Sequence, residues 1–126
     1  MIKYEEWLQQ CKDKKFMYGI SYREIGKLTN VTFQQINHIF LRKKMPSLES
    51  GRSIDNYFDN EIKFEDYVKQ FAELCEGYSD EFLAEYLGVH KLTVRNLLEC
   101  KHVARVETYE KLEELLEMEE EKCLSK

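Results

Sequence analysis

The sequence LAEYLGVHKLTVRNLL, residues 83–98, is the stretch that decides the fold. Gly88 favours a tight turn, because glycine adopts positive φ at little steric cost. The segments on either side of it carry apolar residues at helical spacing. A related stretch, IGKLTNVTFQQINHIF, occupies residues 25–40, and its Gly26 and Asn30 match Ala84 and Gly88 at an offset of 58 residues. Two helices joined by a short turn, with a small residue in the first, form the helix-turn-helix pattern.

A second pair of segments extends the similarity beyond the two turns. KYEEWLQQ, residues 3–10, aligns with KFEDYVKQ, residues 63–70, at an offset of 60. Two collinear matches predict two related units, residues 1–60 and 61–126. We therefore predict an all-α fold of two tandem helix-turn-helix bundles, each with about four to five helices. The scarcity of turn residues, one Pro and five Gly in 126 residues, favours the same class.

Local signals predict where the helices begin and end. Ser21 and Thr32 begin capping-box patterns, and Ser47 can cap a further helix after Pro46 breaks the chain. Asn30 is suited to a turn with positive φ. In the second unit the same order of helices is predicted over residues 64–75, 79–87, 90–98 and from 106 onward.

With its flanking helices, each unit resembles the phage-repressor/Cro (lambda-repressor-like) family of bacterial and phage regulators. The resemblance covers nearly the whole chain, once per half, and includes the basic segment RKKMPS at residues 42–47. Asn30 stands where the family usually has glycine. The resemblance implies a sequence-specific DNA-binding transcriptional regulator, acting as a repressor that occupies its site. Residues 32–41 would be its first recognition helix in the major groove, and residues 90–98 are the candidate second one.

The resemblance also implies which residues contact double-stranded DNA. In the first unit these are Tyr22, Arg23, Thr32, Phe33, Gln34, Asn37, His38, Arg42, Lys43 and Lys44. In the second unit they are His90, Lys91, Arg95, Asn96, Lys101, His102 and Arg105. Glutamine and asparagine suit adenine edges, arginine suits guanine, and the basic loops would meet phosphate.

The formal net charge of −5 is an average over two unlike halves. Residues 1–60 contain 10 basic and 7 acidic residues, whereas residues 61–126 contain 9 and 17. Asp80 and Glu81 replace Tyr22 and Arg23 at the start of the second helix of the pattern. Carboxylates there repel DNA phosphate. The first unit is therefore predicted to be the stronger DNA reader, and the second unit either reads DNA, forms a homodimer or binds a partner.

The acidic second unit is also compatible with a function other than DNA binding. The main alternative is a protein-binding phage factor, such as an anti-CRISPR protein or an inhibitor of a host factor, that uses the acidic second unit. The Glu-rich stretch 107–121 is interpreted as the solvated face of the last helix, and its alternative role is to mimic nucleic acid or bind a basic partner. No catalytic set, phosphate loop or metal-ligand cluster stands out, so we predict no enzyme, cofactor or metal site.

Sequence features also bear on the compartment. No apolar run approaches the roughly 20 residues of a membrane span, and the polar stretch MIKYEEWLQQ does not resemble a signal peptide. Cys11, Cys75, Cys100 and Cys123 are scattered, without a C-x-x-C pair. The scattered cysteines predict reduced thiols in a cytoplasmic protein. The lack of a long apolar run predicts that it has no membrane partner.

Overall fold

The computed structural model describes residues 1–99 and 104–124, with residues 123–124 described by their backbone only. The fold is all-α, as predicted, and in this part of the chain it has eight helices and no strand. None of these helices has both the length and the apolar character needed to cross a bilayer. They are α1 (Tyr4–Tyr18), α2 (Tyr22–Thr29), α3 (Phe33–Phe40), α4 (Leu48–Phe58), α5 (Phe64–Cys75), α6 (Asp80–Leu87), α7 (Lys91–Glu99) and α8 (Val106–Leu124).

Side-chain caps start the helices where the sequence predicts them. The hydroxyl groups of Ser21, Thr32 and Ser47 each accept a backbone N–H from three residues ahead, at 3.2 Å. Ser79 does the same at the start of α6, at 3.1 Å. Each bond satisfies one of the N–H groups that a helix leaves unpaired at its first turn. The predicted starts of α2, α3 and α4 are thereby confirmed.

The turns after α2 and α6 have the same backbone geometry. Asn30 and Gly88 both lie in the left-handed region, at φ values of 58° and 70°. The N–H of Val31 donates to the carbonyl of Gly26 at 3.1 Å, and that of Val89 donates to Ala84 at 3.0 Å. A Cβ atom placed on Gly26 would lie 2.8 Å from the carbonyl oxygen of Val31. A small residue is therefore required where the chain turns back against the helix.

The buried side chains form one hydrophobic cluster that includes residues from both halves of the chain, 1–60 and 61–126. The predicted boundary near residue 60 falls in the connection between α4 and α5. These two helices pack so closely that a Cβ on Gly51 would lie 2.3 Å from the ring of Phe64. The rings of Trp7 and Phe64, from opposite halves, lie 5.1 Å apart between centroids. A shared core suits units of about 60 residues, which bury little surface alone.

A buried carboxylate ties together the helices at this junction. Asp55, in α4, is 3% exposed and accepts three hydrogen bonds. Its donors are Trp7 Nε1 of α1 at 2.7 Å, Asn60 Nδ2 at 2.8 Å and the backbone N–H of Phe64 at 2.7 Å. The last bond also occupies a free N–H at the start of α5. Asp55 therefore acts as a hydrogen-bonding centre between the two halves.

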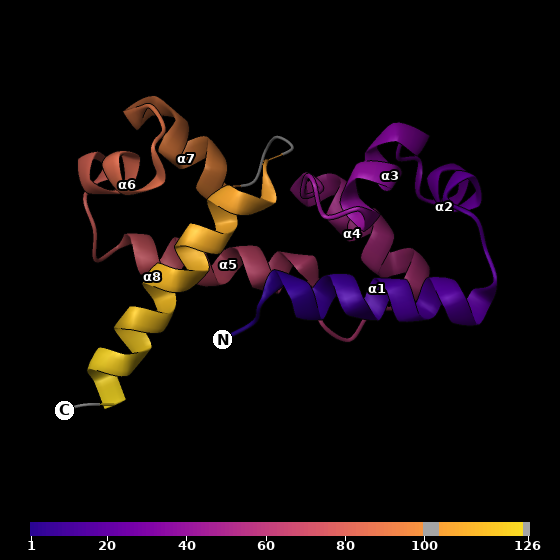
Figure 1. Cartoon of the computed structure of the whole chain (residues 1–126), viewed down its shortest axis with the longest axis horizontal. Coiled ribbons are helices and arrows are strands. Elements are labelled where there is room, and N and C mark those ends of the chain that lie inside the picture. Colours follow the sequence, from indigo (N-terminus) through magenta and orange to yellow (C-terminus); the bar gives the residue numbers. More distant parts are fainter. Residues whose placement is uncertain (100–103, 125–126) are drawn as a thin grey trace.

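The α2–α3 pair and the α6–α7 pair lie toward opposite ends of the long axis, on the same side of α1 and α5 (Figure 1). Between them, the segment before α4 meets the segment before α8. Met45 is buried, and its N–H donates to the carbonyl of Ala104 at 2.8 Å. Lys44 and Arg105 form an isolated antiparallel bridge beside this bond. We call this contact the seam between the halves.

Candidate nucleic-acid interface

Helix α3 has one buried face and one accessible face. Ile36, Ile39 and Phe40 are buried, following the helical period that the sequence shows. Thr32, Phe33 and Gln34 are exposed at the start of the helix, and Asn37 and His38 are half-buried along it. All five predicted DNA contacts within the recognition helix 32–41 are therefore accessible, and four of them carry hydrogen-bonding side chains.

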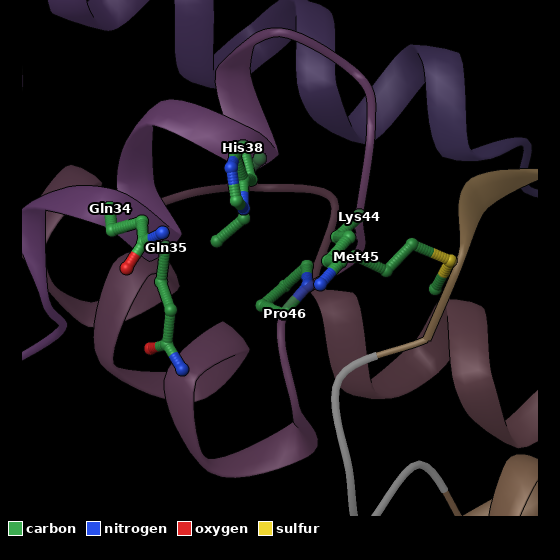
Figure 2. Close-up of a pocket in the computed structure, with 7 residues that line it drawn as sticks. Gln34, Gln35, His38, Lys44, Met45 and Pro46 are labelled. Carbon is green, nitrogen blue, oxygen red and sulfur yellow. The ribbon is translucent and has the colours of Figure 1, made fainter.

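A small pocket lies along the accessible face of α3. It has a volume of about 210 Å³ and is lined by Gln34, Gln35, His38, Ile39, Lys44, Met45 and Pro46. Figure 2 shows the amides of α3 on one side and Lys44 and Pro46 across from His38. The sequence prediction missed Gln35, because its capping-box position explained the residue without a second role. Its spacing of three residues from His38 is the signal that places both on one helical face.

The two predicted residues at the start of α2 differ in their surroundings. Tyr22 is half-buried: its ring lies 5.2 Å from that of Phe40, and the Lys15 ammonium lies 4.7 Å from its centroid. Arg23 is exposed, and its guanidinium lies 4.7 Å from the ring centroid of Phe33. This cation–π contact joins the starts of α2 and α3 into one exposed surface. Tyr22 mainly supports that surface by packing.

The three basic residues after α3 do not act alike. Arg42 has a positive φ of 61°, and its guanidinium pairs with Glu5 of α1 and, at 2.8 Å, with Glu110 of α8. A phosphate would have to compete with these two carboxylates. Lys43 and Lys44 are exposed, and neither forms an ion pair with the residues that the structure describes. Two of the three predicted cations are therefore free to meet an anion.

Basic residues from both halves meet at the seam. A cleft of about 640 Å³ is lined there by His38, Arg42, Lys43, Lys44, Arg105, Val106, Glu107 and Glu110. Arg105, predicted to contact DNA from the second half, thus lies beside the basic loop of the first half. Lys101 and His102 lie outside the described residues. The long separation in sequence between Lys44 and Arg105 left no spacing signal for this juxtaposition.

In the second half, carboxylates of α6 neutralise the cations of α7. Lys91 pairs with Glu81, and Arg95 Nε lies 3.7 Å from Asp80 Oδ2. The hydrogen bond from Lys91 lowers the pKa of Glu81 and raises the pKa of Lys91, so both groups stay charged near neutral pH. His90 and Asn96 are exposed, and His90 Nδ1 accepts the N–H of Leu92 at 3.2 Å. The α7 face is therefore accessible but has no unpaired cation among its predicted contacts.

The interpretation of the Glu-rich stretch as only a solvated face needs correction. Glu113 is half-buried and accepts the hydroxyl of Tyr67 at 2.8 Å and the N–H of Tyr4 at 3.4 Å. Burial raises the pKa of Glu113. Lys3 pairs with Glu117 at 2.6 Å on the same side of α8. This row of α8 thus anchors α1, a contact between the halves that periodicity alone did not reveal.

The described side chains contain no group of three His, Cys, Asp or Glu residues placed to hold a metal ion. Cys11 and Cys75 are free thiols, and burial raises the pKa of Cys11 to about 12. Cys100 and the side chain of Cys123 lie outside the described residues. Comparisons with protein-family models, with curated proteins and with solved structures find no match for this chain. Its function is therefore inferred from its own residues.

Proposed function

We propose that the chain is a sequence-specific DNA-binding regulator that represses transcription by occupying its site. The observation that carries the proposal is the accessible polar face of α3, next to the unpaired cations Lys43 and Lys44. Hydrogen-bonding side chains at the start of a helix suit base edges in the major groove. Free lysines beside that helix suit the flanking phosphates.

The two halves would contribute unequally to binding. In the first half, Gln34 and Asn37 are suited to adenine edges, and the apolar ring of Phe33 to a thymine methyl group. In the second half, Lys91 and Arg95 already have carboxylate partners, and phosphate would have to displace them. We therefore expect one strongly read half-site, with Arg105 adding a backbone contact near the seam.

Selection from randomised DNA duplexes by the full chain tests this proposal. We expect one enriched motif, and an affinity that falls with salt as several phosphate contacts require. Lys44→Glu should weaken binding to all duplexes and reduce the salt slope by about one. Lys111→Glu, the same change at an exposed lysine of α8, is the matched control and should bind nearly as wild type does.

Recognition of the base sequence is tested by a separate variant, because Lys44→Glu tests only contact with phosphate. Asn37→Ala should weaken binding to the selected site by about 1–3 kcal/mol while leaving the affinity for unrelated duplexes nearly unchanged. Equal losses on both DNAs would mean that α3 does not read sequence. No enriched motif, together with equal effects of Lys44→Glu and Lys111→Glu, would refute DNA binding at this surface.

A second candidate function is that of a protein-binding factor, for example a phage inhibitor of a host protein. The observation that favours it is the second half, where α7 cations are neutralised and Leu92 is 78% exposed. A surface without net positive charge and with an exposed apolar side chain suits protein better than DNA. Failure of the duplex selection, with binding to a candidate protein that Leu92→Ser abolishes, would favour this function.

A further inference from the structure

The last turn of α1 leaves large apolar side chains in solvent. Phe16 is 88% exposed and Met17 is 76% exposed. We call these two residues the α1 tip. Exposed Lys12 precedes the tip, and half-buried Lys15 directly adjoins it. Two neighbouring apolar side chains with so little cover form a natural contact site for another surface.

A row of aromatic rings lies at the opposite end of the molecule. Tyr78, just before α6, stacks on Phe82, and Phe82 stacks on Tyr86 within α6; the ring centroids lie 5.0 and 6.0 Å apart, with interplanar angles of 16° and 20°. We call these residues the α6 row. Phe82 at its centre is 42% exposed, and the hydroxyl of Tyr78 bonds to Glu119 of α8. The rings of the row thus pack on one another, Tyr78 bonds to α8, and the middle ring is open to solvent.

The two surfaces carry opposite charge. Residues 12–27, around the α1 tip, contain five basic residues and two acidic ones. Residues 70–90, around the α6 row, contain five carboxylates, of which Asp80 and Glu81 pair with Arg95 and Lys91 of α7. Glu73, Glu76 and Glu85 are exposed there and form no ion pair with other described residues. Each surface therefore combines apolar side chains with a charge that complements the other.

The two surfaces cannot meet within one molecule. Helix α6 and the end of α1 that adjoins α2 lie at opposite ends of the long axis (Figure 1). We propose that the α1 tip of one copy of this chain docks on the α6 row of a second copy. Because the two surfaces differ, the contact is heterologous, and each new copy leaves one free tip and one free row. The assembly is an open head-to-tail chain of molecules rather than a closed dimer.

A second copy satisfies both surfaces at once. An unrelated partner with a basic apolar segment would cover the α6 row but leave the α1 tip in solvent. The contact involves neither α3 nor Lys43 and Lys44, and Arg23 is the one basic residue around the tip that is also a predicted DNA contact, so the inference does not rest on the proposed DNA binding. A regulator that assembles in this way would fill neighbouring sites on DNA cooperatively.

Sedimentation velocity of the full chain without DNA tests the proposal. We expect the average mass to rise with protein concentration and to fall with added salt, because the surfaces attract each other by charge. Phe16→Ser with Met17→Ser should weaken self-association by more than about tenfold, and so should Phe82→Ser. Leu41→Ser removes another exposed apolar residue, with 51% of its surface accessible, near the seam and should leave self-association unchanged. Circular dichroism verifies that each variant is folded.

Mixing the variants gives the decisive result. The tip variant keeps its α6 row, and the row variant keeps its α1 tip, so a mixture should form one-to-one dimers and nothing larger. A wild-type chain that stays monomeric up to millimolar concentration would overturn the proposal. So would a mixture that does not associate, or a tip variant that associates as wild type does. Binding of a lysine-rich amphipathic peptide to the row of a monomeric wild-type chain would assign this surface to a different protein.

Discussion

Removing the Asp55 carboxylate should destabilise the whole chain rather than one half. Its three donors come from α1, from the connection between α4 and α5, and from the first turn of α5. Because Asp55 is only 3% exposed, water has little access to the three donors and cannot readily replace the carboxylate. Asp55→Ala would leave Trp7 Nε1, Asn60 Nδ2 and the N–H of Phe64 buried near an apolar methyl group. The helices that meet at the junction would lose their common partner together.

The expected size of the effect follows from the number of bonds. A hydrogen bond to a charged group contributes about 1.5–3 kcal/mol, so three bonds at the lower value predict a loss of about 4.5 kcal/mol for Asp55→Ala. Asp55→Asn keeps one carbonyl oxygen for Trp7 Nε1 and Asn60 Nδ2, the two donors that share Oδ1. Its amide then faces the N–H of Phe64, and we expect a loss of about 2 kcal/mol.

Urea unfolding followed by circular dichroism measures these free energies of unfolding. Circular dichroism is used instead of tryptophan fluorescence, because the partner variant Trp7→Phe removes the chain's single tryptophan. The double-mutant cycle of Asp55→Ala with Trp7→Phe should give a coupling energy of about 1.5 kcal/mol. Asp66→Ala, at an exposed aspartate of α5, should lose less than about 1 kcal/mol. A loss of under about 1 kcal/mol for Asp55→Ala, or equal losses for Asp55→Ala and Asp55→Asn, would refute the reasoning.

Two further variants test the turn and the anchoring of α8. Gly26→Ala should destabilise the chain, because the added Cβ would lie 2.8 Å from the Val31 carbonyl oxygen. This clash opposes the helix preference of alanine over glycine, which is about 1 kcal/mol. A gain in the free energy of unfolding would show that the turn has room for the methyl group. Because burial raises the pKa of Glu113 above its ordinary value of 4.5, this residue's contribution to stability is fully present below that value and is lost as the pH rises through the folded-state pKa. Glu113→Gln, which still accepts the Tyr67 hydroxyl, should therefore lose less stability than wild type between pH 4.5 and neutrality. Melting temperatures of wild type and Glu113→Gln that change in parallel across this pH range would contradict the raised pKa of Glu113.

Features that depend on neighbouring residues could be predicted from the sequence. The caps at Ser21, Thr32 and Ser47 and the left-handed Asn30 involve atoms within a few residues of each other. Such interactions have the same geometry in almost any protein, so residue type and spacing suffice to predict them. The accessible face of α3 followed from apolar periodicity in the same way.

Contacts between segments that are distant in the sequence could not be predicted from the sequence. Arg42 could be predicted as a cation after α3, but its pairing with Glu5 and Glu110 depends on where α1 and α8 lie. The same holds for Gln35, whose place beside Lys44 and Pro46 depends on the path of the loop. The charge pattern predicted that Asp80 and Glu81 weaken DNA binding by the second half. Their pairing with Arg95 and Lys91 adds a specific contact that a phosphate would have to displace.

The sequence by itself determined the all-α class, the starts of α2, α3 and α4, the repeated turn and the unequal charge of the two halves. These properties depend on local backbone preference, on periodicity and on counting. The tertiary structure alone decided that the halves share one core around Asp55, and that Lys44 and Arg105 meet at the seam. It also decided that the α1 tip and Phe82 of the α6 row stay exposed. Burial, pairing and exposure are set by which distant segments pack together, and no single stretch of sequence encodes that packing.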